Sequence, residues 1–332
     1  HWLDNKRDVS IVRRGYDLFH SIQYMADIIR HLPQMRGYDV VQVTNPVFFD
    51  LRPEKNWAIF KYLKKHNKKI FLDALAIDHY YVKACLDGKT FRYSDFFVGD
   101  RPLPHPEREK MLAAWIGGPN ERPNIEMAQE ANGIIACLYE YYAAYQPEYA
   151  DKLAYIPIPI DLSINPFHPI KSTPEVVKFF IGIQQHRTAI KGTDILLDVL
   201  REIHDKYPRE SHIQKVVSVP FDEYNKLLVD CHILLDQLYS YTPATNALAA
   251  MARGIIAVSG AEPEFYNFIS EQKLRPIINV LPDRNDIFKQ LENLIIHRDQ
   301  LPRLSTESRQ FVEKYHDHVK VARQYLEFWE KH

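Results

Sequence analysis

The sequence predicts an α/β fold with two domains, each built on a parallel β-sheet that helices cover. The 332 residues are enough for two domains of ordinary size. Short apolar segments alternate with amphipathic ones, as they do when parallel strands alternate with helices. A proline-rich stretch over residues 161–174 separates two series of this kind. We therefore expect domains at 1–160 and 175–315, joined by a linker.

The first series contains four expected strands. Continuous apolar runs mark the strands, and the spacing of Leu18, Ile22 and Ile29 places them on one face of a helix. The expected strands are 40–43, 70–75, 133–137 and 153–158, and the expected helices are 16–32, 57–63, 125–131 and 140–145. Residues 80–123 are interrupted by Pro and Gly, so they predict irregular structure.

The second series contains five expected strands with helices between them. The strands are 176–183, 215–219, 231–235, 255–258 and 275–280, and the helices are 192–206, 222–229, 246–252, 285–299 and 306–332. In the last helix, Val319, Leu326 and Trp329 share one side, and that apolar side must be buried.

Composition and charge exclude several classes of protein. With 42 basic and 43 acidic residues the formal net charge is −1, whereas a general nucleic-acid-binding protein has a basic excess. The three cysteines are far apart and predict buried thiols in a reducing compartment. No apolar run approaches the ~20 residues that cross a bilayer, and we find no signal-peptide pattern. We expect a cytoplasmic protein with no nucleic-acid partner.

Five lysines within residues 61–69 leave two interpretations open. A solvated helix end is one. A basic patch for peripheral association with the inner face of a membrane is the other.

Residues 234–260 carry the strongest signal for a ligand site. An apolar run ends at Asp236, a turn follows at Thr242, and a helix of small residues leads to the next apolar run. A loop at the carboxyl ends of parallel strands is the usual place for a ligand, and the free N–H groups of the following helix suit a phosphate. Thr242 or Thr245 is also the expected N-cap of that helix. The polar candidates here are Asp236, Gln237, Tyr239, Tyr241, Thr242, Thr245 and Asn246.

A second loop carries two cations, Arg187 and Lys191, between an expected strand and a helix that starts at Gly192. The planar fork of a guanidinium and the point charge of an ammonium together suit a diphosphate. The alternative is that both are solvated loop residues.

Acidic groups follow two further strands. Glu262 and Glu264 are placed either to accept hydrogen bonds from sugar hydroxyls or to start a helix near its positive dipole end. Asp78 and His79 follow a strand of the first domain, and a carboxylate beside an imidazole suits acid–base chemistry. A structural role for the histidine is the alternative.

Three segments, in order, resemble motifs of the GT-B glycosyltransferases. The resemblance is to the retaining class that uses nucleoside-diphosphate sugars, the family 4 or group 1 type. IPIPIDLSINPFHP at 156–169 is similar to the interdomain segment of that family, and GIQQHRTAIKGTDILLDVL at 182–200 is similar to its Arg–Lys loop. Residues 221–264 resemble its donor site, in a variant similar to a bacterial subgroup that makes surface polysaccharides.

The resemblance implies two Rossmann-like domains that face a cleft, with a last helix at about 316–332 crossing back to the first domain. It implies that the first domain binds a saccharide or lipid-linked acceptor, with Asp78 and His79 as catalytic residues. It also implies that the second domain binds a nucleoside-diphosphate sugar as substrate, with no metal ion and no cofactor, for bacterial polysaccharide or glycoconjugate synthesis. The implied donor contacts are Arg187, Lys191, Asp236, Tyr239, Tyr241, Thr242, Thr245, Asn246, Glu262 and Glu264.

The chain departs from the family pattern at the donor site. The family usually has two glutamates eight positions apart, and the corresponding positions are Tyr241 and Ala249. We therefore expect the nucleotide ribose to be contacted by Glu262, Glu264 or Asp236. The family's first strand, glycine loop and helix also have no counterpart before His1, and residues 207–220 hold one strand where two are implied, so we expect residues to be missing at both places.

Two alternatives remain open. The same fold supports a nucleotide-sugar epimerase or hydrolase, which needs no separate acceptor. The absence of both glutamates also favours a non-catalytic protein that binds a nucleotide sugar without turnover.

Overall fold

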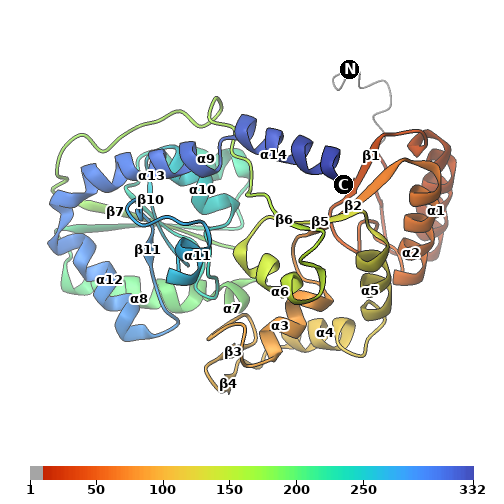
Figure 1. Ribbon diagram of the computed structural model, residues 1–332. Helices are drawn as coiled ribbons and strands as arrows, with labels where there is room; N and C mark the ends of the chain where they lie inside the picture. The colour runs from red at the N-terminus through yellow and green to blue at the C-terminus, as the bar shows by residue number, and fades with distance from the viewer. Residues whose placement is uncertain (1–9) are drawn as a thin grey trace.

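The computed structural model describes residues 10–332 and contains two α/β domains, each with its own parallel sheet (Figure 1). The predicted α/β class is confirmed. The sheet of the first domain has the strand order β1-β2-β5-β6. Its strands are β1 (Val40–Val43), β2 (Lys69–Ala74), β5 (Gly133–Ala136) and β6 (Leu153–Tyr155).

The segment 80–123 is not irregular as predicted, because two helices, a hairpin and the start of a third helix lie within it. Pro106 occupies the first turn of α4 (Pro106–Trp115), where the missing N–H of a proline costs nothing, so a residue that suggested irregular structure begins a helix. The helices of this domain are α1 (Leu18–His31), η1 (Leu32–Met35), α2 (Pro53–His66), α3 (His79–Leu86), α4 (Pro106–Trp115), α5 (Glu121–Glu130) and α6 (Tyr139–Tyr149). The hairpin consists of β3 (Phe97–Val98) and β4 (Arg101–Pro102).

The second sheet has the order β11-β10-β9-β7-β8. Its strands are β7 (Val177–Ile183), β8 (Ser211–Val217), β9 (Ile233–Leu235), β10 (Ile256–Ser259) and β11 (Ile278–Asn279). Strand β8 begins four residues before the predicted start at 215. It is an edge strand on which buried and exposed residues are mixed, so its first half lacks the continuous apolar run of an inner strand.

The predicted helix 306–332 is two helices, because the side chain of Asp317 interrupts it. Asp317 accepts hydrogen bonds from the N–H groups of Val319 and Lys320 and thereby starts a new helix. The helices of the second half are α7 (Thr188–Lys191), α8 (Thr193–Lys206), α9 (Phe221–Leu228), α10 (Thr245–Ala252), α11 (Pro263–Phe268), α12 (Arg284–Ile296), η2 (Arg298–Gln300), α13 (Leu301–Tyr315) and α14 (His318–Lys331).

Helix α14 leaves the second domain and packs on the sheet of the first (Figure 1). Val321 is fully buried against Phe71 of β2, and Lys69 Nζ donates a hydrogen bond to the carbonyl of Trp329 at 2.6 Å. The segment 161–174 runs along the second domain instead of spanning open space, and the Arg309 side chain donates to the carbonyl of Asn165 at 2.9 Å. The two domains are therefore joined by the linker and by the last helix.

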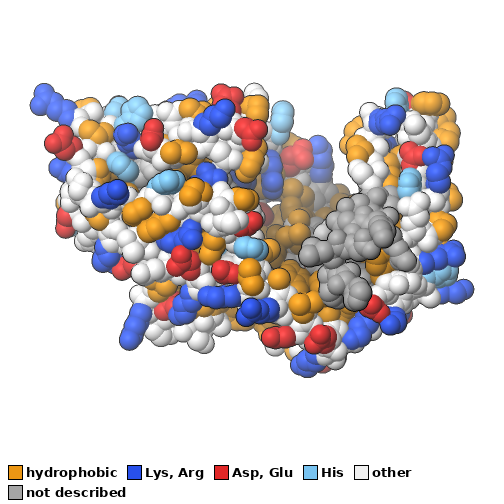
Figure 2. All heavy atoms as spheres, turned by 90° about the horizontal axis from the view of Figure 1, so that it is seen from above, with side chains coloured by type: hydrophobic (Ala, Val, Ile, Leu, Met, Phe, Trp, Pro, Cys, Tyr) orange, Lys and Arg blue, Asp and Glu red, His pale blue; other side chains and the backbone are white. Residues whose placement is uncertain are grey.

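The molecular surface carries both signs of charge. Basic and acidic side chains are interspersed over the face in Figure 2, as the near-zero net charge implies. Within residues 10–332, no helix has the length and apolar character needed to span a bilayer.

Candidate functional site

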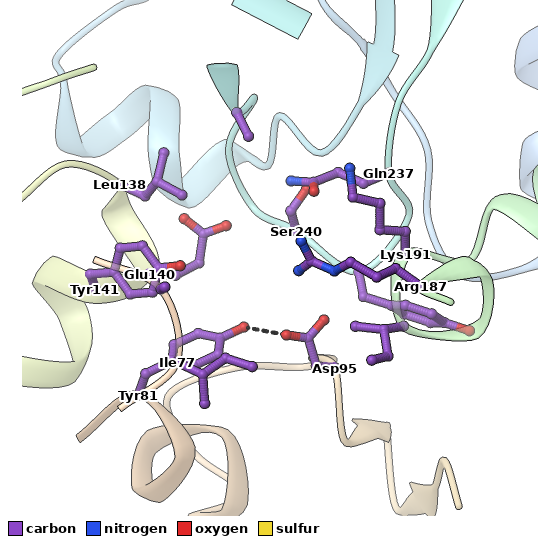
Figure 3. A pocket seen from close by; sticks show the side chains of 14 residues that line it. Ile77, Tyr81, Asp95, Leu138, Glu140, Tyr141, Arg187, Lys191, Gln237 and Ser240 are labelled. Carbon is purple, nitrogen blue, oxygen red and sulfur yellow. Dashed lines mark hydrogen bonds between the residues drawn. The ribbon is translucent and has the colours of Figure 1, made fainter. Parts of the chain in front are cut away.

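A cavity of about 260 Å³ lies between the two domains, and we call it the cleft cavity (Figure 3). Its walls follow the carboxyl ends of strands in both sheets, where open α/β sheets bind ligands. The residues from the first domain are Ala76, Ile77, Tyr81, Asp95, Leu138, Glu140 and Tyr141. Those from the second domain are Arg187, Ile190, Lys191, Gln237, Tyr239, Ser240 and Ala244.

A second cavity, of about 320 Å³, lies within the second domain, and we call it the domain-two cavity. It is lined by Gly182, Ile183, Gln184, Lys191, Val216, Ser218, Val219, Phe221, Tyr224, Asp236 and Asn246. Lys191 lines both cavities. A ligand that occupies both cavities and carries a negative charge between its two parts would place that charge beside the Lys191 ammonium.

The two predicted cations lie at the two ends of α7. Arg187 is its N-cap and Lys191 its last residue, and within residues 10–332 neither side chain makes a hydrogen bond or a salt bridge. Gly192 then turns the chain into α8 with φ of +67°, and a Cβ there would lie 2.7 Å from Cβ of Leu238. Glycine therefore allows α7 to pack closely against the loop after β9, which brings both cations to the cleft cavity.

The start of α10 lies beside these cations. Its N-cap is Ala244, which has no side-chain oxygen, so the prediction that Thr242 or Thr245 caps this helix is wrong. Thr245 is exposed and lines neither cavity, whereas Ala244 lines the cleft cavity. The first N–H groups of a helix without a side-chain cap remain available to an anion.

Asp236 and Asn246 lie together in the domain-two cavity. The Asn246 side chain donates to Asp236 Oδ1 at 3.0 Å and accepts from the Tyr224 hydroxyl at 2.9 Å, which fixes its amide orientation. Asp236 is 3% exposed, and its Oδ2 has no hydrogen-bond partner within residues 10–332. A buried carboxylate oxygen without a donor favours a ligand hydroxyl in this cavity.

Glu140, which sequence reasoning assigned only to a helix, joins the two domains. One carboxylate oxygen accepts the N–H groups of Tyr241 at 2.6 Å and Thr242 at 3.0 Å, and the other accepts the Thr242 hydroxyl at 2.5 Å. Burial raises the pKa of Glu140, while the three donors oppose that rise. An acid in the first turn after a strand end was the available signal. Where the family pattern has a glutamate, this chain has Tyr241, and Glu140 from the opposite domain binds its backbone N–H.

Asp95 is the second acid of the cleft cavity that sequence reasoning missed, because it lies in the segment predicted to be irregular. Its Oδ2 accepts a hydrogen bond from the Tyr81 hydroxyl at 3.1 Å (Figure 3). Burial raises the pKa of Asp95 to about 6, against the Tyr81 hydrogen bond and the charges of Arg108 and Arg187. No motif in the sequence identifies this residue.

Asp78 and His79 do not reach either cavity, so the structure does not support them as catalytic residues. Asp78 is fully buried, caps α3 by accepting from the N–H of Tyr81 at 2.8 Å, and accepts from the Tyr145 hydroxyl at 2.7 Å. Burial raises the pKa of Asp78 to about 6. His79 is 6% exposed, and its Nδ1 lies 2.9 Å from the carbonyl oxygen of Trp115. Both side chains hold helices together, which was the structural alternative.

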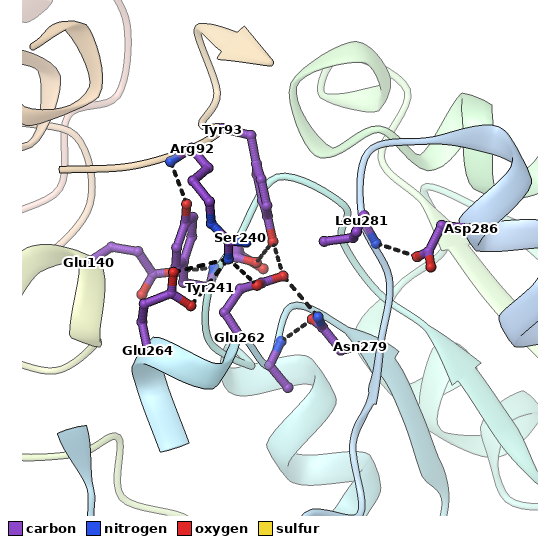
Figure 4. A network of polar contacts seen from close by, with 11 residues as sticks. Arg92, Tyr93, Glu140, Ser240, Tyr241, Glu262, Glu264, Asn279, Leu281 and Asp286 are labelled. Atoms are coloured by element: carbon purple, nitrogen blue, oxygen red, sulfur yellow. Dashed lines mark hydrogen bonds and ion pairs between the residues drawn. The ribbon is translucent and has the colours of Figure 1, made fainter. Parts of the chain in front are cut away.

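Glu262 and Glu264 also lie outside both cavities, where a residue of the first domain pairs with them (Figure 4). The Arg92 guanidinium forms ion pairs with Glu262 and with Glu264, the latter at 3.0 Å. Glu262 is 1% exposed and also accepts from the Tyr93 hydroxyl at 2.7 Å and the Asn279 amide at 2.8 Å. The predicted sugar and ribose contacts of these two glutamates are therefore not supported.

Tyr241 is likewise buried and hydrogen-bonded within the protein, and it lines neither cavity. It is 2% exposed, and its hydroxyl accepts the N–H of Arg92 at 2.6 Å. Of the ten predicted donor contacts, the structure places Arg187, Lys191 and Tyr239 in the cleft cavity and Lys191, Asp236 and Asn246 in the domain-two cavity. Over residues 10–332 no group of three or more His, Cys, Asp or Glu side chains is placed to hold a metal ion.

No protein-family model matches the chain, and no curated protein matches it by sequence. Solved structures match over nearly the whole length. Sucrose-phosphate synthase from Thermosynechococcus elongatus is 13% identical with a TM-score of 0.62, covering 97% of this chain and 82% of its own. Anabaena HepE, in complex with UDP and glucose, is 11% identical with a TM-score of 0.59, covering 96% and 85%.

WaaG, a glycosyltransferase involved in lipopolysaccharide biosynthesis, is 11% identical with a TM-score of 0.51, covering 92% of this chain and 82% of its own. At such identities the likeness establishes the fold. The chain therefore has the two-domain GT-B fold of these glycosyltransferases, with a cavity between its domains.

Proposed function

We propose that this protein is a glycosyltransferase that moves a sugar from a nucleoside-diphosphate sugar to a saccharide or lipid-linked acceptor. The observation that carries the proposal is the position of Lys191 between two cavities. The nucleoside occupies the domain-two cavity, where Asp236 and Asn246 offer groups for its ribose. The diphosphate lies at Lys191 and Arg187, near the uncapped start of α10, and the sugar enters the cleft cavity.

The chemistry required of this site is the stabilisation of a leaving diphosphate. As the bond between the sugar carbon and the phosphate oxygen breaks, negative charge develops on the diphosphate, and the two cations already in place stabilise it. The acceptor hydroxyl attacks the anomeric carbon from the face that the diphosphate leaves. Its oxygen forms the new bond to that carbon, and its proton passes to the departing phosphate oxygen. This retaining course needs no side chain as base, which agrees with the buried positions of Asp78 and His79.

The biological setting in the proposal is bacterial polysaccharide or glycoconjugate synthesis. The fold likeness to WaaG, a glycosyltransferase involved in lipopolysaccharide biosynthesis, supports that setting. A lipid-linked acceptor would bring the protein to the inner face of a membrane by peripheral association.

A thermal-shift screen over UDP-, GDP-, ADP- and dTDP-sugars tests the proposal, because a ligand that binds only the folded protein raises its apparent stability. We expect one nucleotide series to raise the Tm. If none does, the proposal is wrong. Turnover then separates the alternatives: a transferase releases nucleoside diphosphate faster when an acceptor is added, a hydrolase or epimerase converts the donor alone, and a binding protein converts nothing.

A further inference from the structure

We propose that Asp95 binds the sugar ring of the donor and determines which sugar is accepted. This inference rests on the proposed function and names a residue that the family pattern does not supply. Asp95 belongs to the first domain, just before the β3–β4 hairpin, whereas the nucleotide site lies in the second domain. The two domains would then divide the recognition of one donor molecule between them.

The backbone of Asp95 is tied to the helix that carries the two cations. Arg108, 5% exposed, donates through Nε to the carbonyl of Asp95 and through its terminal nitrogen to the carbonyl of Ala189 at 2.7 Å. Ala189 lies in α7 between Arg187 and Lys191. One buried guanidinium therefore fixes the position of the Asp95 backbone relative to the proposed diphosphate site.

One oxygen of the Asp95 carboxylate accepts a hydrogen bond that orients the group, and the other oxygen can accept a hydrogen bond from a ligand. Tyr81, 7% exposed, donates its hydroxyl to Oδ2 at 3.1 Å, which directs the carboxylate. Within residues 10–332 the other oxygen has no hydrogen-bond partner. Figure 3 shows Asp95 and Arg187 reaching into the same cavity from opposite domains. Oδ1 is thus an acceptor at the place where a sugar attached to the diphosphate would lie.

Asp95 is the acid in this cavity that remains available to a ligand. The other acid in the wall, Glu140, already accepts three hydrogen bonds from Tyr241 and Thr242. Hydroxyl groups donate strongly to carboxylates, and a buried polar group built to bind a hydroxyl rejects analogues that lack it. The cavity, at about 260 Å³, lies below the ~300–1,000 Å³ typical of drug-sized ligands, so it suits a single sugar ring.

The test compares UDP with UDP-glucose, and with the corresponding pair for whichever nucleotide series raises the Tm of the wild-type protein. Titration calorimetry is performed on wild type, Asp95→Asn and Asp95→Ala. We expect both variants to bind the free nucleoside diphosphate within about twofold of wild type. Asp95→Ala removes the acceptor and should bind the nucleotide sugar at least about tenfold more weakly, whereas Asp95→Asn keeps a neutral acceptor and should weaken it by a smaller factor. A residue that merely supported the fold would weaken both ligands equally.

Asp100→Asn is the matched control, because it makes the same chemical change on an exposed residue of the same hairpin region. It should leave both affinities unchanged. Unchanged nucleotide-sugar affinity in Asp95→Ala, or equal weakening of both ligands, would overturn the inference. Failure of the proposed function looks different, because the wild-type protein would then bind neither the nucleoside diphosphate nor its sugar.

Discussion

A carboxylate oxygen of Glu140 accepts the backbone N–H of Tyr241 at 2.6 Å, and this hydrogen bond crosses from the first domain to the second. The same carboxylate binds the N–H and hydroxyl of Thr242. It therefore fixes the loop that leads into α10, on which the proposed phosphate site depends. The position of the donor loop is set in part by the domain that faces it.

Two substitutions of Glu140 distinguish the contribution of its charge from the contribution of its hydrogen bonds to stability and binding. In Glu140→Ala three buried donors lose their acceptor, so we expect unfolding in urea to show a loss of ~2–4 kcal/mol. Calorimetry should show weaker binding of the nucleoside diphosphate as well, because the loop is released. Glu140→Gln keeps the shape and most hydrogen bonds and should lose less than half as much. A Glu140→Ala protein with wild-type stability and affinity would show that this contact is incidental.

The two cations should act together on the diphosphate. We expect Arg187→Ala and Lys191→Ala each to raise the Kd of the nucleoside diphosphate on the order of tenfold, since each removes one charge-assisted contact. Lys289→Ala, an exposed cation on α12, is the matched control and should have no effect. Binding that survives the double variant unaltered would place the diphosphate elsewhere.

The pair Arg92–Glu262 should couple the two domains energetically. Glu262 is nearly fully buried, so removing Arg92 leaves a buried carboxylate with neutral donors alone, Tyr93 and Asn279. A double-mutant cycle with Arg92→Met and Glu262→Gln should give a coupling energy of ~1–2 kcal/mol in urea unfolding. Additive effects of the two substitutions would mean that this ion pair contributes nothing to stability.

Asp73 should make stability fall as the pH rises. Burial raises its folded-state pKa from 3.8 to about 7, and one of its oxygens has no partner within residues 10–332. Between pH 4 and pH 7 the Asp73 carboxyl binds a proton in the folded state but not in the unfolded chain. The contribution of this proton to folding stability is therefore complete below pH 4 and is lost as the pH rises to 7. Asp73→Asn should therefore exceed wild type in stability by an amount that grows with pH, up to roughly 4 kcal/mol.

Urea titrations of both proteins at pH 5 and pH 8 measure this difference. A constant offset between the two proteins at both pH values would contradict the assigned titration of Asp73.

Periodicity and apolar runs were sufficient to predict the α/β class and most strands, because the two large sheets are parallel, whereas the arrangement of two facing domains was expected from the family resemblance. The inner strands β5 and β9 are continuous apolar segments, and β2 and β7 each contain an apolar run of at least three residues. Edge strand β8 was predicted too short because its buried and exposed residues are mixed, so its first half shows no continuous apolar run. In the segment 80–123, proline signals were misread because Pro106 starts a helix.

Prediction of the site was less complete, because a local sequence pattern describes one helix, strand or loop, whereas a cavity is lined by residues from several such elements. Arg187 and Lys191 lie at the two ends of α7, close together in the sequence, so a local pattern could single them out. Asp95 and Glu140 reach the cavity only through the packing of two domains, which no local pattern records. The same packing pairs Glu262 with Arg92, 170 residues away in the chain, and so removes it from the predicted site.

The most direct test of the central claim is a crystal structure of the protein with the nucleotide sugar that raises its Tm most. We predict the nucleoside beside Asp236 in the domain-two cavity, the diphosphate within hydrogen-bond distance of Lys191 Nζ, and the sugar in the cleft cavity against Asp95. A nucleotide bound outside these two cavities, or with its diphosphate away from Lys191, would contradict the account.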